Sequence, residues 1–369
     1  MTEGGAEPLP LRRVHVAGAG LIGTSVGLAL RRAGIGVTLS DPHRENARRA
    51  EELGAGRAVA EPAEADVFVA AAPAHAVADV LCSAVAANLA ATYTDVAGVK
   101  AGPLAEVAAA YPGLATLVGG HPMAGRERSG PGAARTDLFD GRPWIVTPLP
   151  RSDEQAVATV EALARACRAT PVRMAPAEHD RAVALVSHAP HVVAALVAGR
   201  LADAADRSVA VAGTGIRDIT RVAESAPDPW VALLRANAAP VAEVLRELRT
   251  DLDRGITALE ALATDQTDTS AATSLRALLA AGGAGRARLP GRHGGRPEHL
   301  AAVPVVVPDR PGELARLLVA VGEAGINVED LAIEHSLGQP AGLTELLVRP
   351  KEAGRLADVL SAQGWSVHH

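Results

Sequence analysis

The chain has 369 residues, of which 48% are hydrophobic and 21% are charged, and its formal net charge is -6 at pH 7. This length exceeds that of one hydrophobic core and predicts two or three domains, and the composition excludes a disordered or fibrous protein. The acidic balance argues against a nucleic-acid partner. Residues 1–10 lack the basic and apolar regions of a signal peptide, which favours a cytoplasmic protein.

No segment of the sequence is typical of a membrane span or of a cysteine site. The most apolar long stretch, residues 182–199, contains two histidines and a proline and precedes Arg200, so it favours a buried helix over a span. Cys82 and Cys167 stand alone in alanine-rich helical patterns, without the paired spacing of a metal site. We expect both thiols to be inert core groups.

The first chemical motif is a glycine turn between a strand pattern and a helix pattern, in residues 14–34. Its first glycine permits a tight turn, the second lets the backbone approach a pyrophosphate, and the third lets the helix pack closely on the strand. Asp41 ends the next strand pattern about 20 residues later, where a carboxylate accepts hydrogen bonds from a ribose and repels a 2′-phosphate. The motif therefore predicts NAD. The expected cofactor-binding residues of the turn are Gly18, Gly20, Leu21, Ile22 and Gly23.

Further strand patterns alternate with helix patterns up to residue 176. They predict a Rossmann-like dinucleotide-binding domain over residues 1–176, with a mostly parallel sheet and a ligand crevice at the carboxyl ends of its strands. The strand patterns cover residues 65–73, 91–100, 116–122, 143–149 and 171–176. One of them ends at "GGHP", which places His121 at this crevice.

The rest of the chain changes character twice. Residues 177–282 carry only helix patterns and predict an all-helical domain, apolar enough to need a partner subunit as cover, as in a homodimer. Residues 283–299 are rich in Gly, Arg and Pro and predict a linker. Residues 300–369 repeat strand, helix and strand, which predicts a small ferredoxin-like α+β domain.

A nicotinamide-binding domain beside a helical domain predicts hydride transfer in the cleft between them. His121 is the best general base or hydrogen-bond acceptor, because imidazole titrates near neutral pH. His188 and His191 share a helix face, but no third ligand is placed by the sequence, so a metal site is disfavoured. Arg221 is either a bidentate clamp for a carboxylate or a surface charge, and spacing does not separate the two.

Five motifs together resemble the prephenate dehydrogenases of tyrosine biosynthesis. They are GAGLIG at 18–23, TDVAGVK at 94–100, GGHPMAGRERSG at 119–130, HDRAVALVSHAPH at 179–191 and TGIRDITRVAESAPDPW at 214–230. The resemblance implies NAD-dependent oxidative decarboxylation of prephenate to 4-hydroxyphenylpyruvate. It also implies that His121 hydrogen-bonds the ring hydroxyl and assists its deprotonation, and that Arg221 binds a substrate carboxylate.

The resemblance implies further site residues and shows one departure. Lys100 would support the cofactor or substrate region, and Trp230 would reach the site of a neighbouring subunit. Gly98 stands where the family usually has a serine close to the catalytic histidine, so either a water or another side chain replaces the hydrogen bond of that hydroxyl, or the substrate is a variant one. The residues that would line the substrate pocket are Glu127, Ser187, His188, His191 and Trp230.

The segment at 308–331, PDRPGELARLLVAVGEAGINVEDL, is similar to an ACT domain, a module that commonly binds amino acids. The similarity implies feedback by tyrosine or a related aromatic amino acid at Asp309, Gly312 and Asn327, or else a module that only promotes oligomerisation. Two other functions stay open for the whole chain. One is an arogenate or 4-amino-4-deoxyprephenate dehydrogenase, and the other is a nucleotide-binding regulator that senses amino acids without turnover.

Overall fold

The computed structural model describes residues 11–126, 128–289, 300–335 and 341–368. The chain falls into two compact units, Met1–Arg249 and Thr250–His369, and the boundary lies inside a single long helix, α11 (Ala238–Thr264). Each unit is therefore described by itself.

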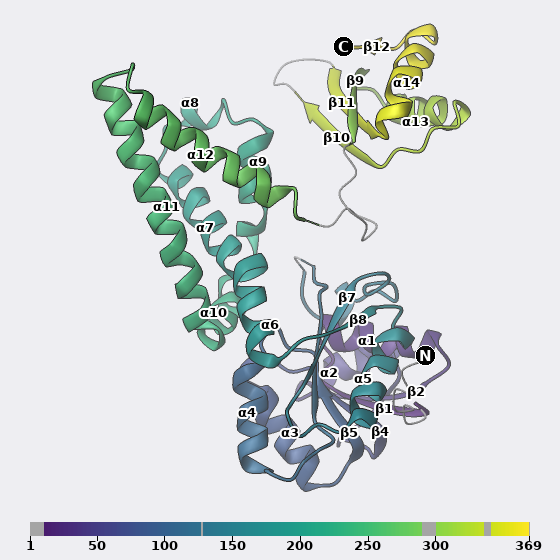
Figure 1. Cartoon of the computed structure of the whole chain (residues 1–369). Helices are drawn as coiled ribbons and strands as arrows, with labels where there is room; N and C mark the ends of the chain where they lie inside the picture. Colours follow the sequence, from purple (N-terminus) through teal and green to yellow (C-terminus); the bar gives the residue numbers. More distant parts are fainter. Residues whose placement is uncertain (1–10, 127, 290–299, 336–340, 369) are drawn as a thin grey trace, which may run out of the picture. The chain divides into compact units, whose positions relative to one another are not determined.

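The first unit begins with a five-stranded parallel sheet of order β3-β2-β1-β4-β5 (Figure 1). This is the Rossmann-like domain that the glycine turn predicted; only the two-residue strand β3 was not expected. The strands are β1 (Arg13–Ala17), β2 (Gly36–Ser40), β3 (Arg57–Ala58), β4 (Ala65–Ala70) and β5 (Ala90–Asp95). The helices after them are α1 (Leu21–Arg32), α2 (Arg44–Glu52), α3 (Val77–Ala86) and α4 (Ala101–Ala110).

A second, three-stranded sheet continues from β5 and departs from the expected parallel series. It comprises β6 (Val118–Pro122), β7 (Pro143–Pro148) and β8 (Thr170–Arg173), and a single bridge from Tyr93 to Leu117 joins it to β5. Strands β6 and β7 are antiparallel, whereas β7 and β8 are parallel. The described chain between β6 and β7 contains only a short 3-10 turn, so no crossover helix carries it back to the starting edge. Helix α5 (Glu154–Ala166) makes that crossover between β7 and β8.

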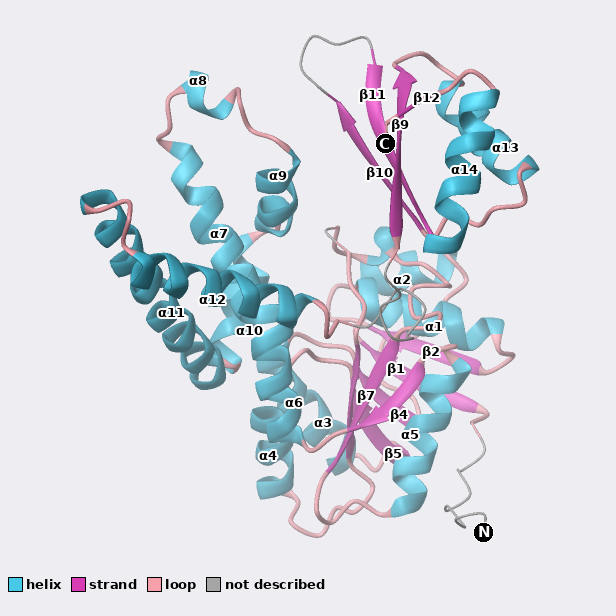
Figure 2. Ribbon diagram, turned by 45° about the horizontal axis from the view of Figure 1, so that its top comes forward, coloured by secondary structure: helices cyan, strands magenta, loops and turns pink. Residues whose placement is uncertain are grey.

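Helices cover both faces of these sheets (Figure 2). Side chains of α1, α2 and α5 form one core with the strands, and side chains of α3 and α4 form another. Cys167 is fully buried in the first core, and burial raises the pKa of its thiol. Cys82 is half-buried against the second, where burial and the charge of Asp79 raise its thiol pKa. Both thiols therefore stay protonated and unreactive at neutral pH.

The helical part starts with a continuous helix of two α-helical segments around a π-helical turn. The segments are α6 (Pro176–Val183) and α7 (Ala189–Ala202), and the turn between them is η3 (Ala184–His188). Residues Pro176–Gly199 are long and apolar enough to cross a membrane by length and composition alone. The apolar window of this helix is 33% buried, so the buried helix expected from the sequence is only partly buried. Its buried polar side chains, His179, Asp180 and His188, make hydrogen bonds to other parts of the first unit. The elements that follow are α8 (Asp206–Val209), α9 (Thr214–Thr220), the 3-10 turn η4 (Arg221–Glu224) and α10 (Pro227–Ala236).

The helices extend further than the expected domain end at residue 282. Helix α12 (Thr269–Arg286) runs through Gly282, Gly283 and Gly285, so the first residues of the expected linker are helical. Glycine-rich composition suggested a break, but Asp268 caps the start of α12 and the helix continues through these glycines. Residues 290–299 of the expected linker lie outside the described residues.

The C-terminal part has the strand and helix order of a ferredoxin-like domain. Its antiparallel sheet has the order β10-β11-β9-β12. A buried core of Leu317, Leu346 and Trp365 joins this sheet to two helices, and the Arg316 guanidinium lies 3.9 Å from the Trp365 ring. The elements are β9 (Ala301–Pro308), α13 (Glu313–Glu323), β10 (Asp330–His335), β11 (Ala341–Val348), α14 (Pro350–Ala362) and β12 (Ser366–Val367).

Candidate active site

The glycine turn has the shape that a dinucleotide requires. Gly18 has a φ of +115°, and a Cβ there would lie 2.2 Å from the carbonyl oxygen of Ala71. A Cβ on Gly23 would lie 1.9 Å from the Gly18 oxygen, so both positions exclude a side chain. Gly20 has no atom within 4 Å of its Cβ position, which leaves the backbone open to a ligand.

A hydrogen bond connects the glycine turn to Asp41, the carboxylate predicted to bind the ribose. Leu21 and Ile22 begin α1, and no side chain caps this helix N-terminus, so its N–H groups suit an anion. The Ala19 N–H donates to Asp41 Oδ2 at 2.7 Å, and the His43 N–H donates to Asp41 Oδ1 at 2.8 Å. Asp41 is thereby held beside the turn at the end of β2. The residues present fit the adenosine and pyrophosphate parts of NAD.

The glycine pair before His121 lets β6 lie directly on a buried ion pair. A Cβ on Gly119 would lie 3.2 Å from a side-chain carbon of Lys100, and a Cβ on Gly120 would lie 2.7 Å from the carbonyl oxygen of Asp95. The Lys100 ammonium is fully buried, pairs with the Asp95 carboxylate and donates to the Gly120 carbonyl at 2.7 Å. The Gly120 N–H donates to Asp95 Oδ1 at 3.2 Å. Both members of the pair thus hold the residue that precedes His121.

Lys100 therefore has an internal role in addition to the predicted one. Burial lowers the pKa of its ammonium, and the neighbouring Asp95 carboxylate opposes that effect. The ammonium bonds the Asp95 carboxylate and the Gly120 carbonyl, so the side chain lies against the strand that carries His121. A direct contact of Lys100 with the cofactor stays a prediction.

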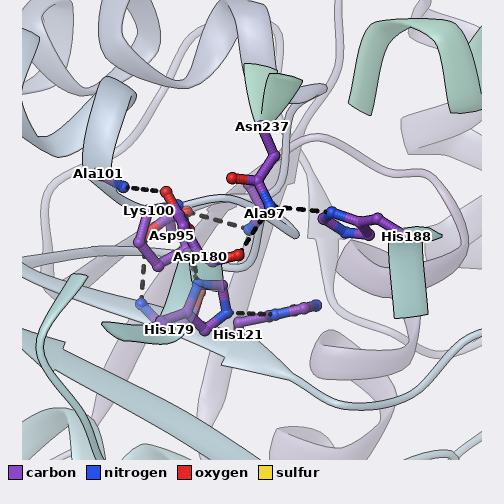
Figure 3. A network of polar contacts seen from close by, with 10 residues as sticks. Asp95, Ala97, Lys100, Ala101, His121, His179, Asp180, His188 and Asn237 are labelled. Atoms are coloured by element: carbon purple, nitrogen blue, oxygen red, sulfur yellow. Dashed lines mark hydrogen bonds and ion pairs between the residues drawn. The ribbon is translucent and has the colours of Figure 1, made fainter. Parts of the chain in front are cut away.

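His121 is the first member of a row of three side chains (Figure 3). Its Nδ1 lies 2.8 Å from His179 Nε2, and His179 Nδ1 lies 2.8 Å from Asp180 Oδ1. The Lys100 N–H donates to Asp180 Oδ1 at 2.8 Å and the Ala101 N–H donates to Asp180 Oδ2 at 2.9 Å. These contacts join the end of β6, the start of α4 and α6 in one buried polar network.

The electrostatics of the network keep His121 neutral. Burial lowers the pKa of His121 well below its ordinary value, and the nearby positive charge of Lys100 lowers it further. Burial by itself would raise the pKa of Asp180, but hydrogen bonds from His179 and from the backbone of Ala101 and Lys100 outweigh it, so the net direction is downward. A neutral imidazole and an ionised carboxylate are the resulting states.

Gly98, the departure from the family pattern, lies beside the other edge of the His121 ring. A Cβ on Gly98 would lie 3.8 Å from both Cε1 and Nε2 of His121 and 3.0 Å from a methyl carbon of Leu233. A serine here would bring a hydroxyl close to Nε2, but Leu233 of α10 would have to move. In this chain, contacts on the Nδ1 side of His121 hold the ring.

The predicted pocket histidines form a second group on the same long helix. The Asn237 side-chain amide donates to the backbone carbonyl of Asp180 at 2.8 Å and to His188 Nδ1 at 3.0 Å. Burial lowers the pKa of His188 to about 4. The His191 ring stacks on Trp230 with 3.5 Å between ring centroids, and His188 meets the same indole edge-on at 6.3 Å. His188, His191 and Trp230 are thus brought together within one chain.

The remaining predicted pocket residues are Ser187, Arg221 and Glu127. Ser187 is half-buried in the π-helical turn, and Arg221 is exposed at the start of η4, which packs against α7. Glu127 lies outside the described residues. The roles of Arg221, Ser187 and Glu127 toward a substrate stay predictions, as does the contribution of Trp230 to a neighbouring subunit.

Several polar members of the site were not predicted from the sequence. His179 and Asp180 belong to a segment that was expected at the cleft, yet only its later histidines were singled out. The signal for Asp180 was an acidic residue beside a histidine in an otherwise apolar helix. Asn237 carried no signal, because a single amide between two helix patterns is ordinary. The members missed are Asp95, His179, Asp180 and Asn237.

Two family models match successive parts of the chain. Residues 26–172 match the nucleotide-binding domain of prephenate dehydrogenase, and residues 175–277 match its dimerisation domain. The chain is 39% identical over 359 residues to a probable prephenate dehydrogenase, NovF, from Streptomyces niveus, which covers 96% of this chain and 99% of that protein.

More distant relatives point the same way. The prephenate dehydrogenase of Bacillus subtilis is 30% identical over 337 residues, which cover 87% of each chain. The crystal structure of prephenate dehydrogenase from A. aeolicus, in complex with hydroxyphenyl propionate and NAD+, has a TM-score of 0.65 and 23% identity over 75% of this chain and 99% of that one, which supports the fold. The family expected from the five motifs is confirmed: this chain belongs to the prephenate dehydrogenase family of NAD-dependent oxidoreductases.

Proposed function

We propose that this chain catalyses the NAD-dependent oxidative decarboxylation of prephenate to 4-hydroxyphenylpyruvate. The observation that carries the proposal is the state of His121, a neutral imidazole held through its Nδ1 at the carboxyl edge of the sheets of a Rossmann-like domain. His121 Nε2 is the atom available to accept a hydrogen bond from the ring hydroxyl of the substrate.

The reaction balances with this geometry. The C–H bond at the hydroxyl-bearing ring carbon breaks with its electron pair, and NAD supplies the acceptor for that hydride. The bond to the ring carboxylate breaks with its pair entering the ring, so carbon dioxide leaves and the ring becomes aromatic. His121 Nε2 accepts the hydroxyl hydrogen bond while positive charge develops on the ring, and the proton ends on the product phenol. His121 thus stabilises the transition state and consumes no proton overall.

Substrate binding is assigned to the group around α7. The Nδ1 atom of His191 is buried and has no hydrogen-bond partner among the described residues, a state that costs about 1–3 kcal/mol unless a ligand or water satisfies it. Arg221 has the planar fork that binds a carboxylate bidentately. We assign the substrate carboxylates to these two side chains, and the walls of the pocket to Glu127, Ser187, His188 and Trp230.

Assembly and control follow from the other parts of the chain. We assign the homodimer to the helical domain, whose surface exposes Leu185 and Val186 at 60% each and Leu196 at 65%. The match to a dimerisation domain supports that choice. We assign feedback by tyrosine to an ACT-like domain over residues 300–369, with the effector at Asp309, Gly312 and Asn327. We expect the enzyme to work in the cytoplasm.

The experiment that tests the proposal supplies the protein with NAD and, in turn, prephenate, arogenate and 4-amino-4-deoxyprephenate, and follows NADH absorbance. We expect prephenate to give the highest kcat/KM. Preference for an amino analogue would move the assignment to the alternative dehydrogenase. An absence of NADH with all three would leave the nucleotide-binding regulator as the function.

The role of His121 is tested by His121→Asn. Loss of the hydrogen-bond acceptor should lower kcat by about 10²-fold or more. Binding of NAD, measured by calorimetry, should change little, because the glycine turn and Asp41 are untouched. An unchanged kcat would remove His121 from the chemistry.

A further inference from the structure

We propose that His179 and Asp180 are positioning residues that hold His121 in the tautomer protonated at Nδ1, so that its Nε2 is an acceptor toward the substrate. The inference rests on the proposed function for its kinetic consequence. The tautomer itself is argued from the hydrogen bonds of the row, independently of that function. The row of three side chains is drawn in Figure 3.

The direction of every hydrogen bond in the row follows from its far end. Both oxygens of Asp180 face backbone N–H groups, those of Lys100 and Ala101, and a backbone N–H can only donate. The carboxyl group therefore accepts on both oxygens, and these hydrogen bonds lower its pKa and favour the ionised form. His179 must then donate its Nδ1–H to Asp180 Oδ1 at 2.8 Å.

The tautomer of His179 sets that of His121. In the singly protonated ring that this proposal takes for His179, the proton on Nδ1 leaves a lone pair on Nε2, and this atom lies 2.8 Å from His121 Nδ1. His121 then donates from Nδ1, and the lone pair of its own ring is on Nε2. Two backbone amides, one carboxylate and one imidazole thus determine the chemical character of an atom at the opposite end of the row.

The row is rigid enough to enforce this state. His179 is fully buried and Asp180 is 4% exposed. The Asp180 side chain of α6 lies against the N-terminus of α4, where it accepts from the Lys100 and Ala101 amides. The main-chain carbonyl of Asp180 accepts from Asn237. On the other edge of the His121 ring, Gly98 offers no side chain that could bind Nε2. Control of the tautomer therefore lies with His179 and Asp180.

Without the His179 acceptor, the Nε2 atom of His121 would change from a hydrogen-bond acceptor to a donor, although the imidazole would remain. If His179 could not accept, His121 would be free to protonate at Nε2 and would present a donor to the substrate hydroxyl. Hydride transfer would then lose its hydrogen-bond acceptor, whereas the contacts that bind NAD and the substrate carboxylates would remain. The expected signature is a fall in kcat with little change in either KM.

Two substitutions of one residue separate this role from a structural one. His179→Asn keeps a donor near Asp180 but is too short to reach His121, and His179→Gln places an acceptor where Nε2 stood. We expect kcat to fall about 10²-fold or more in His179→Asn and less than about 10-fold in His179→Gln. His368→Asn, an exposed position in the other unit, is the matched control. Equal losses of kcat in the Asn and Gln variants would overturn the positioning role.

The tautomer is read independently of activity by nitrogen NMR of protein carrying 15N-labelled histidine. We expect the His121 signals, assigned with His121→Asn, to show a protonated Nδ1 and an unprotonated Nε2, and we expect this pattern to reverse or mix in His179→Asn. Protonation of His121 at Nε2 in the native protein would overturn the inference. If no substrate gave NADH, the proposed function would fail, yet this spectrum would still decide the tautomer.

Discussion

At the scale of single residues, the site depends on a histidine that is kept neutral. Burial is the largest cause of the lowered pKa of His121, and the nearby positive charge of Lys100 adds to it. The neutral ring is the form that accepts a hydrogen bond, so a lowered pKa preserves the active form at lower pH. Burial also lowers the pKa of His188 to about 4, which keeps a second positive charge away at neutral pH.

These directions predict the pH dependence of the enzyme. An unshifted histidine loses its lone pair as the pH falls through 6.5, whereas His121 and His188 should stay neutral through that range. We expect kcat/KM for prephenate to be flat from pH 7.5 to about 6 and to fall only at lower pH. A profile measured in buffers of constant ionic strength checks this. An acid limb centred at or above 6.5 would contradict the lowered pKa.

At the scale of elements, β6 is the part that carries His121 to its place. Its two glycines allow the strand to lie on Asp95 and Lys100 without intervening side chains. The ion pair is buried away from water. Within it, the Lys100 ammonium bonds the Asp95 carboxylate and the Gly120 carbonyl. Such a pair positions the backbone more than it stabilises the fold, because desolvation offsets much of the attraction.

The glycine requirement predicts the effect of one methyl group. In Gly120→Ala the added Cβ would meet the Asp95 carbonyl at 2.7 Å and the indole nitrogen of the buried Trp144 at 2.9 Å, and neither can move freely. We expect a loss of about 1–3 kcal/mol in the free energy of unfolding and a lower kcat. Urea unfolding measures the first. Gly113→Ala, with open space at its Cβ position, is the control, and equal stabilities of the two variants would contradict the close approach.

At the scale of the whole molecule, the order of domains was readable and the contacts across the chain were not. Strand patterns, the glycine turn and the loss of strand signal after residue 176 predicted the Rossmann-like and helical parts, because periodicity is local. His179 lies 58 residues from His121, and Asn237 lies 57 from Asp180, so no spacing rule connects them. The antiparallel pairing of β7 with β6 was not predicted for the same reason, since the direction of strand pairing is a tertiary property.

The proposed effector domain gives the prediction at this scale. Tyrosine should lower the rate of the full chain, and Asp309→Ala combined with Asn327→Ala should abolish the response without changing the rate in its absence. Asn327 donates to Glu329 at 3.1 Å, so far-UV circular dichroism should confirm that the variant is folded. Asp358→Ala on the exposed surface of α14 is the control. An equal tyrosine response in native and double-variant protein would leave oligomerisation as the role of this domain.

The π-helical turn between α6 and α7 determines which residues of this long helix face the Asn237 amide. A regular helix advances about 100° per residue, so Asp180 and His188, eight residues apart, would point about 80° from each other. The wider turn absorbs one residue and brings the two positions within about 20° of the same helix face, where the Asn237 amide donates to the main-chain carbonyl of Asp180 and to the ring of His188. Deleting a residue there would give a more regular helix and a misaligned pocket.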